Sequence, residues 1–145
     1  MLLLLMSVVG VLTAGCPAPI QYQPAEKLVN EWGVPQAKQR LEEVMSRAIN
    51  PRIVDMDVTD AFLRYRYPLD YLLGNPSGAT TMEKRVVFRD VGRVEIFDNH
   101  VVFVWGTDGS ILSQMVFTNA EDAKRFADLV FSFRAYGSRG GSSMR

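Results

Sequence analysis

Apolar side chains recur at every second position over most of the stretch from Ile53 to Phe117, and Gly, Asn and Asp residues separate the runs. This period is that of a β-strand with one face buried and the other in water. Before and after this stretch the apolar residues take a helical spacing. The chain is therefore predicted to be α+β, with an N-terminal amphipathic helix, an antiparallel meander of about six strands and a closing C-terminal helix.

Two amphipathic helices are predicted to flank the meander, after a short helical stretch that ends at Trp32. The first runs from Pro35 to Ile49, and proline suits a first helical turn. The second begins with the spacing of a capping box, Thr118 at the N-cap and Glu121 three residues later. Its apolar stripe is Ala123, Phe126, Ala127, Val130 and Phe133. We expect it to end near Ala135, before a disordered tail over residues 136–145.

The first predicted hairpin turns at Thr59–Asp60, treated as a two-residue loop. One face is apolar and is expected to meet the core; it carries Val54, Met56, Val58, Ala61, Leu63, Tyr65 and Tyr67. On the other face this register sets Asp55 across from Arg64, with Asp57 and Arg66 beside them. Paired aspartates can hold a metal ion or act as acid and base, but the neighbouring arginines favour solvated ion pairs.

The later strands are predicted to turn at Asp98–Asn99 and again at Asp108–Gly109. With two-residue loops, the core face carries Val94, Ile96, Val101, Phe103 and Trp105. The opposite face, which carries Phe97, Val102 and Val104, is then expected to point to solvent. The same register sets Gln114 beside Phe103, so a bulge near Gly106 stays an open alternative.

Two apolar segments are candidate binding surfaces because solvent is expected around them. One is the strand face with Phe97, Val102 and Val104. The other is the trio Tyr71, Leu72 and Leu73, in a predicted connection from Pro68 to Met82. A loop of this length is often functional or mobile. The alternative is that the trio packs under the sheet.

Few residues of the chain are suited to catalysis or metal binding. The chain has one Cys and one His, which excludes an intramolecular disulfide and a Cys/His zinc site. A zero formal charge gives no basic footprint for nucleic acid. His100 at a turn is interpreted as a surface residue, although Ser110 and Ser113 lie nearby in sequence. No catalytic residue, metal or cofactor is therefore predicted.

The first sixteen residues carry no charge, and the run from Met1 to Val11 is too short to span a bilayer. Ala14 and Gly15 directly before Cys16 resemble the lipobox of bacterial lipoproteins, although Thr13 stands where the family usually has Leu and no Lys or Arg precedes the apolar run. This resemblance implies cleavage of residues 1–15 as a signal peptide and acylation of Cys16. Two or three acyl chains would anchor the protein stably. The alternative is that Cys16 is a small apolar residue of a frayed or buried N-terminus.

Four segments are predicted in all: the leader 1–15, a lipidated and proline-rich tether 16–24, a single α+β domain 25–135 and the tail 136–145. Pro17 follows the cysteine, and the lipoprotein resemblance associates inner-membrane retention with Asp at that position. The outer membrane, facing the periplasm, is therefore the expected location in a Gram-negative cell.

The stretch from Val86 to Phe133 resembles bacterial domains of the pleckstrin-homology-like superfold. The resemblance rests on Phe88, the Asp90–Val91 step, Val94-Glu95-Ile96, two hairpins and the helix of Ala120-Glu121-Asp122-Ala123 and Phe126-Ala127. It implies a bent sheet or barrel plugged by the last helix, and a non-catalytic module that binds lipids, peptides or proteins. The basic lipid-phosphate loop of the lipid-binding members has no counterpart here.

Taken together, these patterns predict a membrane-anchored envelope lipoprotein whose module binds or assembles with a protein partner. A carrier or sensor of a lipid or other apolar ligand is the second hypothesis, and it requires a dry cavity inside the bent sheet. A hydrolase is the third, and it requires carboxylates or serines that converge on His100.

Overall fold

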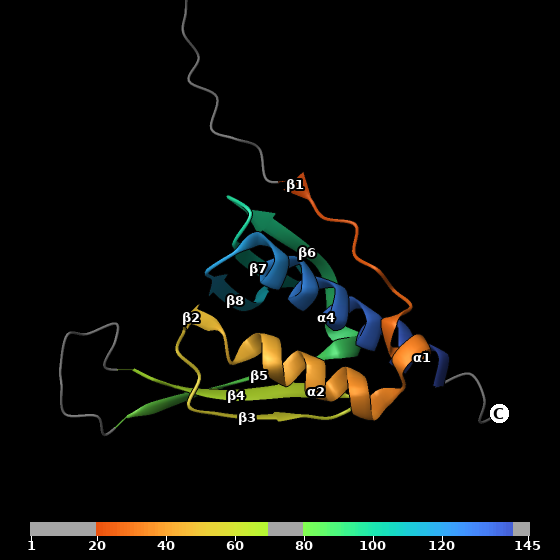
Figure 1. Ribbon diagram of the computed structural model, residues 1–145, viewed down its shortest axis with the longest axis horizontal. Helices are drawn as coiled ribbons and strands as arrows, with labels where there is room; N and C mark the ends of the chain where they lie inside the picture. Colours follow the sequence, from red (N-terminus) through yellow and green to blue (C-terminus); the bar gives the residue numbers. More distant parts are fainter. Residues whose placement is uncertain (1–19, 70–79, 141–145) are drawn as a thin grey trace, which may run out of the picture.

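The computed structural model describes residues 20–69 and 80–140, and they form two antiparallel sheets and three α-helices around one core (Figure 1). The α+β class predicted from the sequence is confirmed. The strands in chain order are β1 (Ile20–Gln21), β2 (Ala48–Asn50), β3 (Asp55–Val58), β4 (Phe62–Pro68), β5 (Thr81–Val87), β6 (Val91–Phe97), β7 (Val101–Gly106) and β8 (Ile111–Phe117). The helices are α1 (Leu28–Trp32), α2 (Val34–Met45) and α4 (Ala120–Gly140), with a short 3-10 turn η1 (Phe88–Asp90).

The strands divide into a five-stranded sheet in the order β1-β6-β7-β8-β2 and a three-stranded sheet in the order β3-β4-β5. The predicted meander is present as the two runs β3-β4-β5 and β6-β7-β8. The sheets do not close into a barrel, so the bent-sheet form of the prediction holds and the barrel form does not. In Figure 1, α4 lies across β7 and β8, and α2 lies across the three-stranded sheet.

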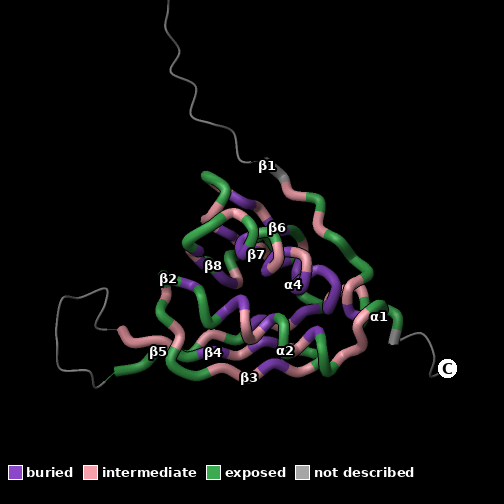
Figure 2. The backbone as a smooth tube through the Cα atoms, viewed as in Figure 1, coloured by how far each residue is buried: buried purple, intermediate pink, exposed green. Residues whose placement is uncertain are grey.

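Helix α4 lies at the centre of the core. All five residues of the predicted stripe are buried, and so are Leu129 and Phe131. Two aromatic pairs join the helix to its neighbours: Phe126 packs on Phe117 of β8, and Phe133 stacks on Phe88 of η1 at 4.8 Å between ring centroids. Figure 2 shows buried backbone concentrated where α4 and α2 face the sheets.

Both ends of α4 differ from the prediction. Its capping box forms one residue later, since the Asn119 side chain accepts from the Asp122 amide and donates to the Asp122 carboxylate. Arg47 also pairs with Asp122 at 3.1 Å. The predicted end near Ala135 is wrong, because the helix continues to Gly140 with Ser138 bonded back to the Ala135 carbonyl. Residues 136–140 are therefore helix, and 141–145 lie outside the described residues.

Helix α2 ends at Met45 and not at Ile49. The apolar residues at helical spacing in the predicted range are all buried: Ala37, Leu41, Val44, Met45 and Ala48. Ala48, however, reaches the core as part of strand β2, which pairs with β8 in the register Ala48↔Phe117. The helical spacing of apolar residues continues beyond Met45 because Ala48, a buried residue of β2, lies at the position where another turn of α2 would have placed a buried residue.

The first hairpin keeps the predicted alternation of its side chains in a different register. Of the predicted core face, Val58, Leu63 and Tyr65 are buried, whereas Val54 and Ala61, at its two ends, are exposed and do not meet the core as expected. The hairpin loop is longer than two residues, because the Thr59 hydroxyl accepts from the amides of Ala61 and Phe62. Asp55 is therefore opposite Arg66 and Asp57 opposite Arg64. The shift is two residues, which preserves the face of every side chain. The expected solvated ion pairs form on the outer face, at 2.9 Å for Asp55–Arg66 and 3.7 Å for Asp57–Arg64.

The β6–β7 hairpin differs by one residue, and its faces are therefore exchanged. Asp98 and Asn99 form the predicted turn, both with positive φ, and His100 donates its amide to the Phe97 carbonyl. His100 is then an extra residue on the β7 side, so that Phe97 pairs with Val101. Val102 and Val104 consequently face the core, fully buried opposite Ile96 and Val94. Their assignment to a solvent face was wrong.

The other members of the predicted core face lie on the outer side of the sheet. Val101, Phe103 and Trp105 alternate with the buried valines and are only partly buried. Phe103 pairs with the exposed Gln114, as the two-residue register predicted. No conflict arises from that pairing, because both side chains point outward. The register irregularity considered near Gly106 occurs between Val104 and Trp105.

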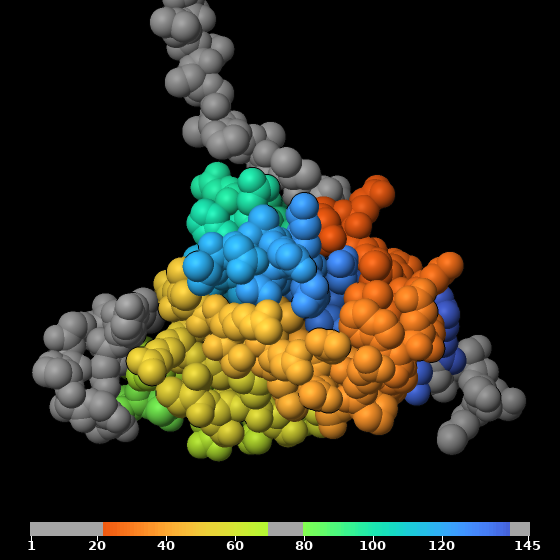
Figure 3. All heavy atoms as spheres, viewed as in Figure 1, coloured from red at the N-terminus to blue at the C-terminus, as the bar shows by residue number. Residues whose placement is uncertain are grey.

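One buried hydrogen bond joins the two sheets. The hydroxyls of Tyr65 on β4 and Ser113 on β8 are 2.7 Å apart, and both residues are 1% exposed. Burial raises the pKa of Tyr65 to about 12, so its hydroxyl keeps its proton over the whole physiological range. In Figure 3, segments from residues 20–60 pack directly against segments from residues 110–140, so distant parts of the chain share this core.

The folded domain begins before Ala25, its predicted first residue, because the segment that precedes Ala25 is bound to it. Strand β1 pairs with the edge of β6, Ile20 with Ile96. Further along, Tyr22 and the Ala25 amide both donate to Oδ1 of Asp128 on α4, at 3.0 and 2.8 Å. Residues 20–24, predicted as tether, therefore belong to the folded body.

The Tyr65–Ser113 bond gives the first testable prediction. Tyr65→Phe leaves the buried Ser113 hydroxyl without its partner and is expected to lower the free energy of unfolding by about 1 to 3 kcal/mol. The double variant Tyr65→Phe/Ser113→Ala removes both groups and should cost less than the sum of the two single changes. Urea unfolding of the four proteins measures the cycle. Strictly additive losses would contradict a direct bond between the sheets.

A second prediction concerns the attachment of the N-terminal segment. Asp128→Ala removes the acceptor for both Tyr22 and Ala25, so the amides of Ile20 and Gln21 should exchange with deuterium faster while the amides of β7 keep their protection. Glu121→Ala is the matched control, because Glu121 lies on the same helix and, among the described residues, pairs only with Arg125. Equal exchange in the two variants would show that Asp128 does not hold this segment.

Candidate functional site

The outer side of the five-stranded sheet carries the most continuous set of aromatic contacts on the described surface. Phe97, Phe103 and Trp105 form a row across β6 and β7. Phe97 meets Phe103 edge-on at 5.2 Å, and Phe103 stacks on Trp105 at 6.2 Å between centroids. We call these three residues, with Val101, the outer aromatic face.

A charged pair fixes one end of this face. Glu95 receives a hydrogen bond from the Trp105 indole at 2.8 Å and one from Arg93 at 3.0 Å. The Arg93 guanidinium also lies over the Trp105 ring, 4.5 Å from its centroid. With both carboxylate oxygens in use, the Trp105 ring is held in one orientation. A fixed, partly exposed aromatic side chain loses little conformational entropy when another surface packs on it.

The predicted site residues are distributed differently from expectation. Phe97 lies on the outer aromatic face, as predicted for a binding surface. Val102 and Val104 are buried in the core and form no surface. Tyr71, Leu72 and Leu73 lie outside the described residues, and so does Cys16. Of that connection only the ends are described, where β4 and β5 pair as far as Pro68↔Thr81.

The sequence reasoning missed Phe103 and Trp105 as surface residues. Their apolar character and spacing matched a core face, and the alternative face contained two valines that were equally suitable. Glu95 does not distinguish the two registers, because it lies on the outer side of β6 in both of them. The registers differ only on β7, where the extra residue His100 in the turn brings Phe103 and Trp105 outward.

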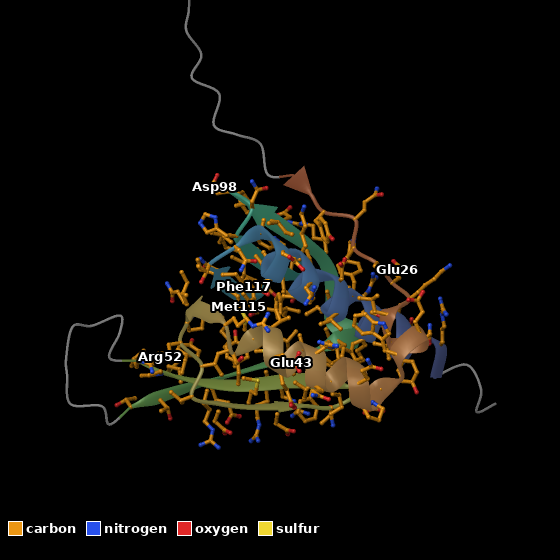
Figure 4. The ribbon with its side chains drawn as sticks, in the orientation of Figure 1. Glu26, Glu43, Arg52, Asp98, Met115 and Phe117 are labelled. Atoms are coloured by element: carbon orange, nitrogen blue, oxygen red, sulfur yellow. The ribbon has the colours of Figure 1, made fainter. Side chains whose placement is uncertain are left out.

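Within residues 20–69 and 80–140, the serines and carboxylates that a hydrolase would need do not converge on His100. Its ring nitrogen Nδ1 contacts the Asp98 carbonyl at the tip of the β6–β7 turn, next to β1; Figure 4 shows the position of Asp98. Ser110 bonds to Asp108 in the next turn, and Ser113 is buried against Tyr65. The Ser110 hydrogen bonds hold the pKa of Asp108 below its usual value, as expected for a turn that needs an ionised acceptor.

The interior is occupied by side chains where the carrier hypothesis requires a cavity. Met115 and Phe117 of β8 lie in the middle of the domain, as Figure 4 shows, and both are 0% exposed. They belong to a continuous core with side chains of α2, α4 and both sheets. A groove lined by Arg85, Arg89 and Arg139 opens at the surface and not within this core.

Two further properties concern the described ranges 20–69 and 80–140. Within them, no three His, Cys, Asp or Glu side chains come together as a metal site. None of their helices has both the length and the apolar character that crossing a bilayer requires.

Comparison of the chain with family models, with curated proteins and with solved structures gives no match.

The exchange of faces on β7 gives a third prediction. Val102→Asp sets a carboxylate in the core and is expected to lower the free energy of unfolding by more than about 4 kcal/mol. Phe103→Asp, one residue away, keeps its charge in water and should cost about 1 to 2 kcal/mol, the loss of its ring contacts. Thermal unfolding followed by circular dichroism compares the two. A larger loss of unfolding free energy for Phe103→Asp than for Val102→Asp would contradict the surface position of Phe103.

Proposed function

We propose that this protein is a membrane-anchored envelope lipoprotein whose pleckstrin-homology-like module binds a protein partner through the outer aromatic face and catalyses no reaction. Acyl chains on Cys16 provide the anchor. In a Gram-negative cell the module faces the periplasm from the outer membrane. The observation that carries the proposal is the row of Phe97, Phe103 and Trp105 on a sheet surface that the described part of the chain leaves partly exposed.

Two properties of this face favour a protein partner. Aromatic residues and arginine are enriched where proteins bind one another, and they contribute most of the binding energy. The outer aromatic face combines both, since Arg93 stacks on Trp105 beside it. The face also lies on the outer surface of a sheet with Arg93 and Glu95 beside it, whereas small ligands bind in concave pockets, so this surface suits a protein partner better than a small ligand.

The short distance between anchor and sheet supports the same proposal. Ile20, the first residue of β1, follows Cys16 by four residues. An extended chain of four residues spans at most about 14 Å. An acylated Cys16 therefore keeps the β1–β6 edge close to the bilayer surface, and with it the outer aromatic face on β6 and β7. The partner is then a protein of the envelope that is itself at or near the membrane.

The fourth prediction tests anchor and surface separately. In a bacterial host, a fatty-acid analogue should label the full chain and fail to label Cys16→Ser. A photo-crosslinking amino acid at position 103 should then join the anchored chain to one discrete envelope protein. The matched control position is Arg64, because it lies on the outward face of the other sheet, among ion pairs.

The outcomes are distinguishable. Absence of label on both chains contradicts the anchor. A labelled chain that gives the same crosslinks from positions 103 and 64, or none from 103, contradicts the outer aromatic face as the binding surface while leaving the anchor in place.

A further inference from the structure

A groove lined by arginines opens where α4 ends, on a part of the molecule that the proposed function does not use. It has a volume of about 770 Å³, which lies in the range of small-ligand sites. Four separate segments form it: Asn30 of α1, the turn before β4 with Asp60, the end of β5 with η1, and the last turns of α4. The phenyl ring of Phe62 and the phenol ring of Tyr136 provide its apolar surface.

Three arginines from three segments meet at this groove: Arg85 of β5, Arg89 of η1 and Arg139 of α4. Asp60 is the one carboxylate in the lining, so the groove carries a formal charge of +2 in a chain whose net charge is zero. Within the described ranges, Arg85 and Arg139 form no ion pair, and Arg89 pairs only with its exposed sequence neighbour Asp90 at 3.4 Å. Elsewhere in those ranges most exposed arginines have a carboxylate partner.

The Arg85 side chain is already held in place. Its guanidinium carbon lies 4.1 Å from the centroid of the Phe62 ring. Stacking engages the flat face of a guanidinium and leaves the N–H groups at its edge free. These groups match two oxygens of one oxyanion, and the stacked geometry reduces the entropy that binding would cost.

We propose that this groove binds a small soluble organic phosphate, with the phosphate between Arg85, Arg139 and Arg89 and an aromatic or apolar body against Phe62 and Tyr136. A single carboxylate needs only one guanidinium for a bidentate pair, whereas the lining charge of +2 matches a phosphate dianion. Figure 1 shows α1 and the end of α4 well away from β1, so the groove does not share the edge that an anchor on Cys16 would hold at the membrane. This position favours a soluble ligand over a lipid headgroup.

The fifth prediction uses phenyl phosphate as the probe and isothermal titration calorimetry on the full chain in a neutral detergent. Phenyl phosphate is expected to bind with a Kd below about 1 mM. Arg85→Gln and Arg139→Gln should each weaken it about 10-fold or more, which corresponds to about 1.4 kcal/mol. Asp60→Asn removes the opposing charge and should tighten binding.

Arg52→Gln is the matched control, since Arg52 is exposed, unpaired within the described ranges and lies on the other side of the molecule (Figure 4). Its affinity for phenyl phosphate should equal that of the parent chain. Benzoate should bind more weakly than phenyl phosphate, and vesicles of phosphatidylglycerol should bind no better than vesicles of phosphatidylcholine.

Each contrary result overturns a defined part of the proposal. Lack of phenyl phosphate binding, or equal weakening by Arg52→Gln, removes the site. Benzoate binding as tight as that of phenyl phosphate removes the assignment of a dianion. Binding of phosphatidylglycerol vesicles that Arg85→Gln abolishes, without binding of phenyl phosphate, assigns the groove to a lipid headgroup instead. None of these results depends on acylation of Cys16, so the proposed function stands or falls separately.

Discussion

Burial of α4 is the constraint on which the other elements depend. From Leu129 to Phe133 every residue of the helix is buried, which requires neighbours on all sides and not only beneath one stripe. Three polar side chains of the same helix then hold segments from the other end of the chain. Ser132 accepts the Val29 amide at 2.7 Å, Asp128 accepts from Tyr22 and Ala25, and Asp122 pairs with Arg47. Because buried or partly buried polar groups need specific partners, these contacts select one arrangement where apolar packing alone would accept several.

The comparison of two hairpins shows what alternation in a sequence can and cannot determine. Both were assigned two-residue loops, and both have a different register in the structure. In the β3–β4 hairpin the shift is two residues, so the buried positions Val58, Leu63 and Tyr65 and the ion-paired face were predicted, although the cross-strand partners were not and Val54 is exposed. In the β6–β7 hairpin the added residue is His100, and a shift of one residue exchanged core and surface. The alternation of side chains shows that a strand has two faces. Where both faces carry apolar residues, the geometry of the turn determines which face is buried.

The same limit explains how much of the candidate surface could be predicted. Phe97 was identified because it lies before the turn, where the bulge at His100 has no effect. Val102 and Val104 follow the turn and were misplaced together, and Phe103 and Trp105 were misplaced with them. The arginine groove gave no local pattern, since Arg85, Arg89 and Arg139 are separated by up to 54 positions and meet only when α4 has packed against η1. In the fold, these arginines stand out because few carboxylates lie near them. Sequence spacing cannot reveal this property for residues so far apart.

The two surfaces have one physical property in common, which is that their side chains are fixed before any ligand arrives. Glu95 uses both oxygens to hold Arg93 and Trp105, and Phe62 supports the guanidinium of Arg85. Each arrangement removes rotamer freedom in the free protein, so less entropy remains to be lost on binding. An isolated exposed ion pair contributes little to stability, and neither arrangement is needed to fill the core. Both surfaces are therefore ordered before the proposed partner or ligand binds.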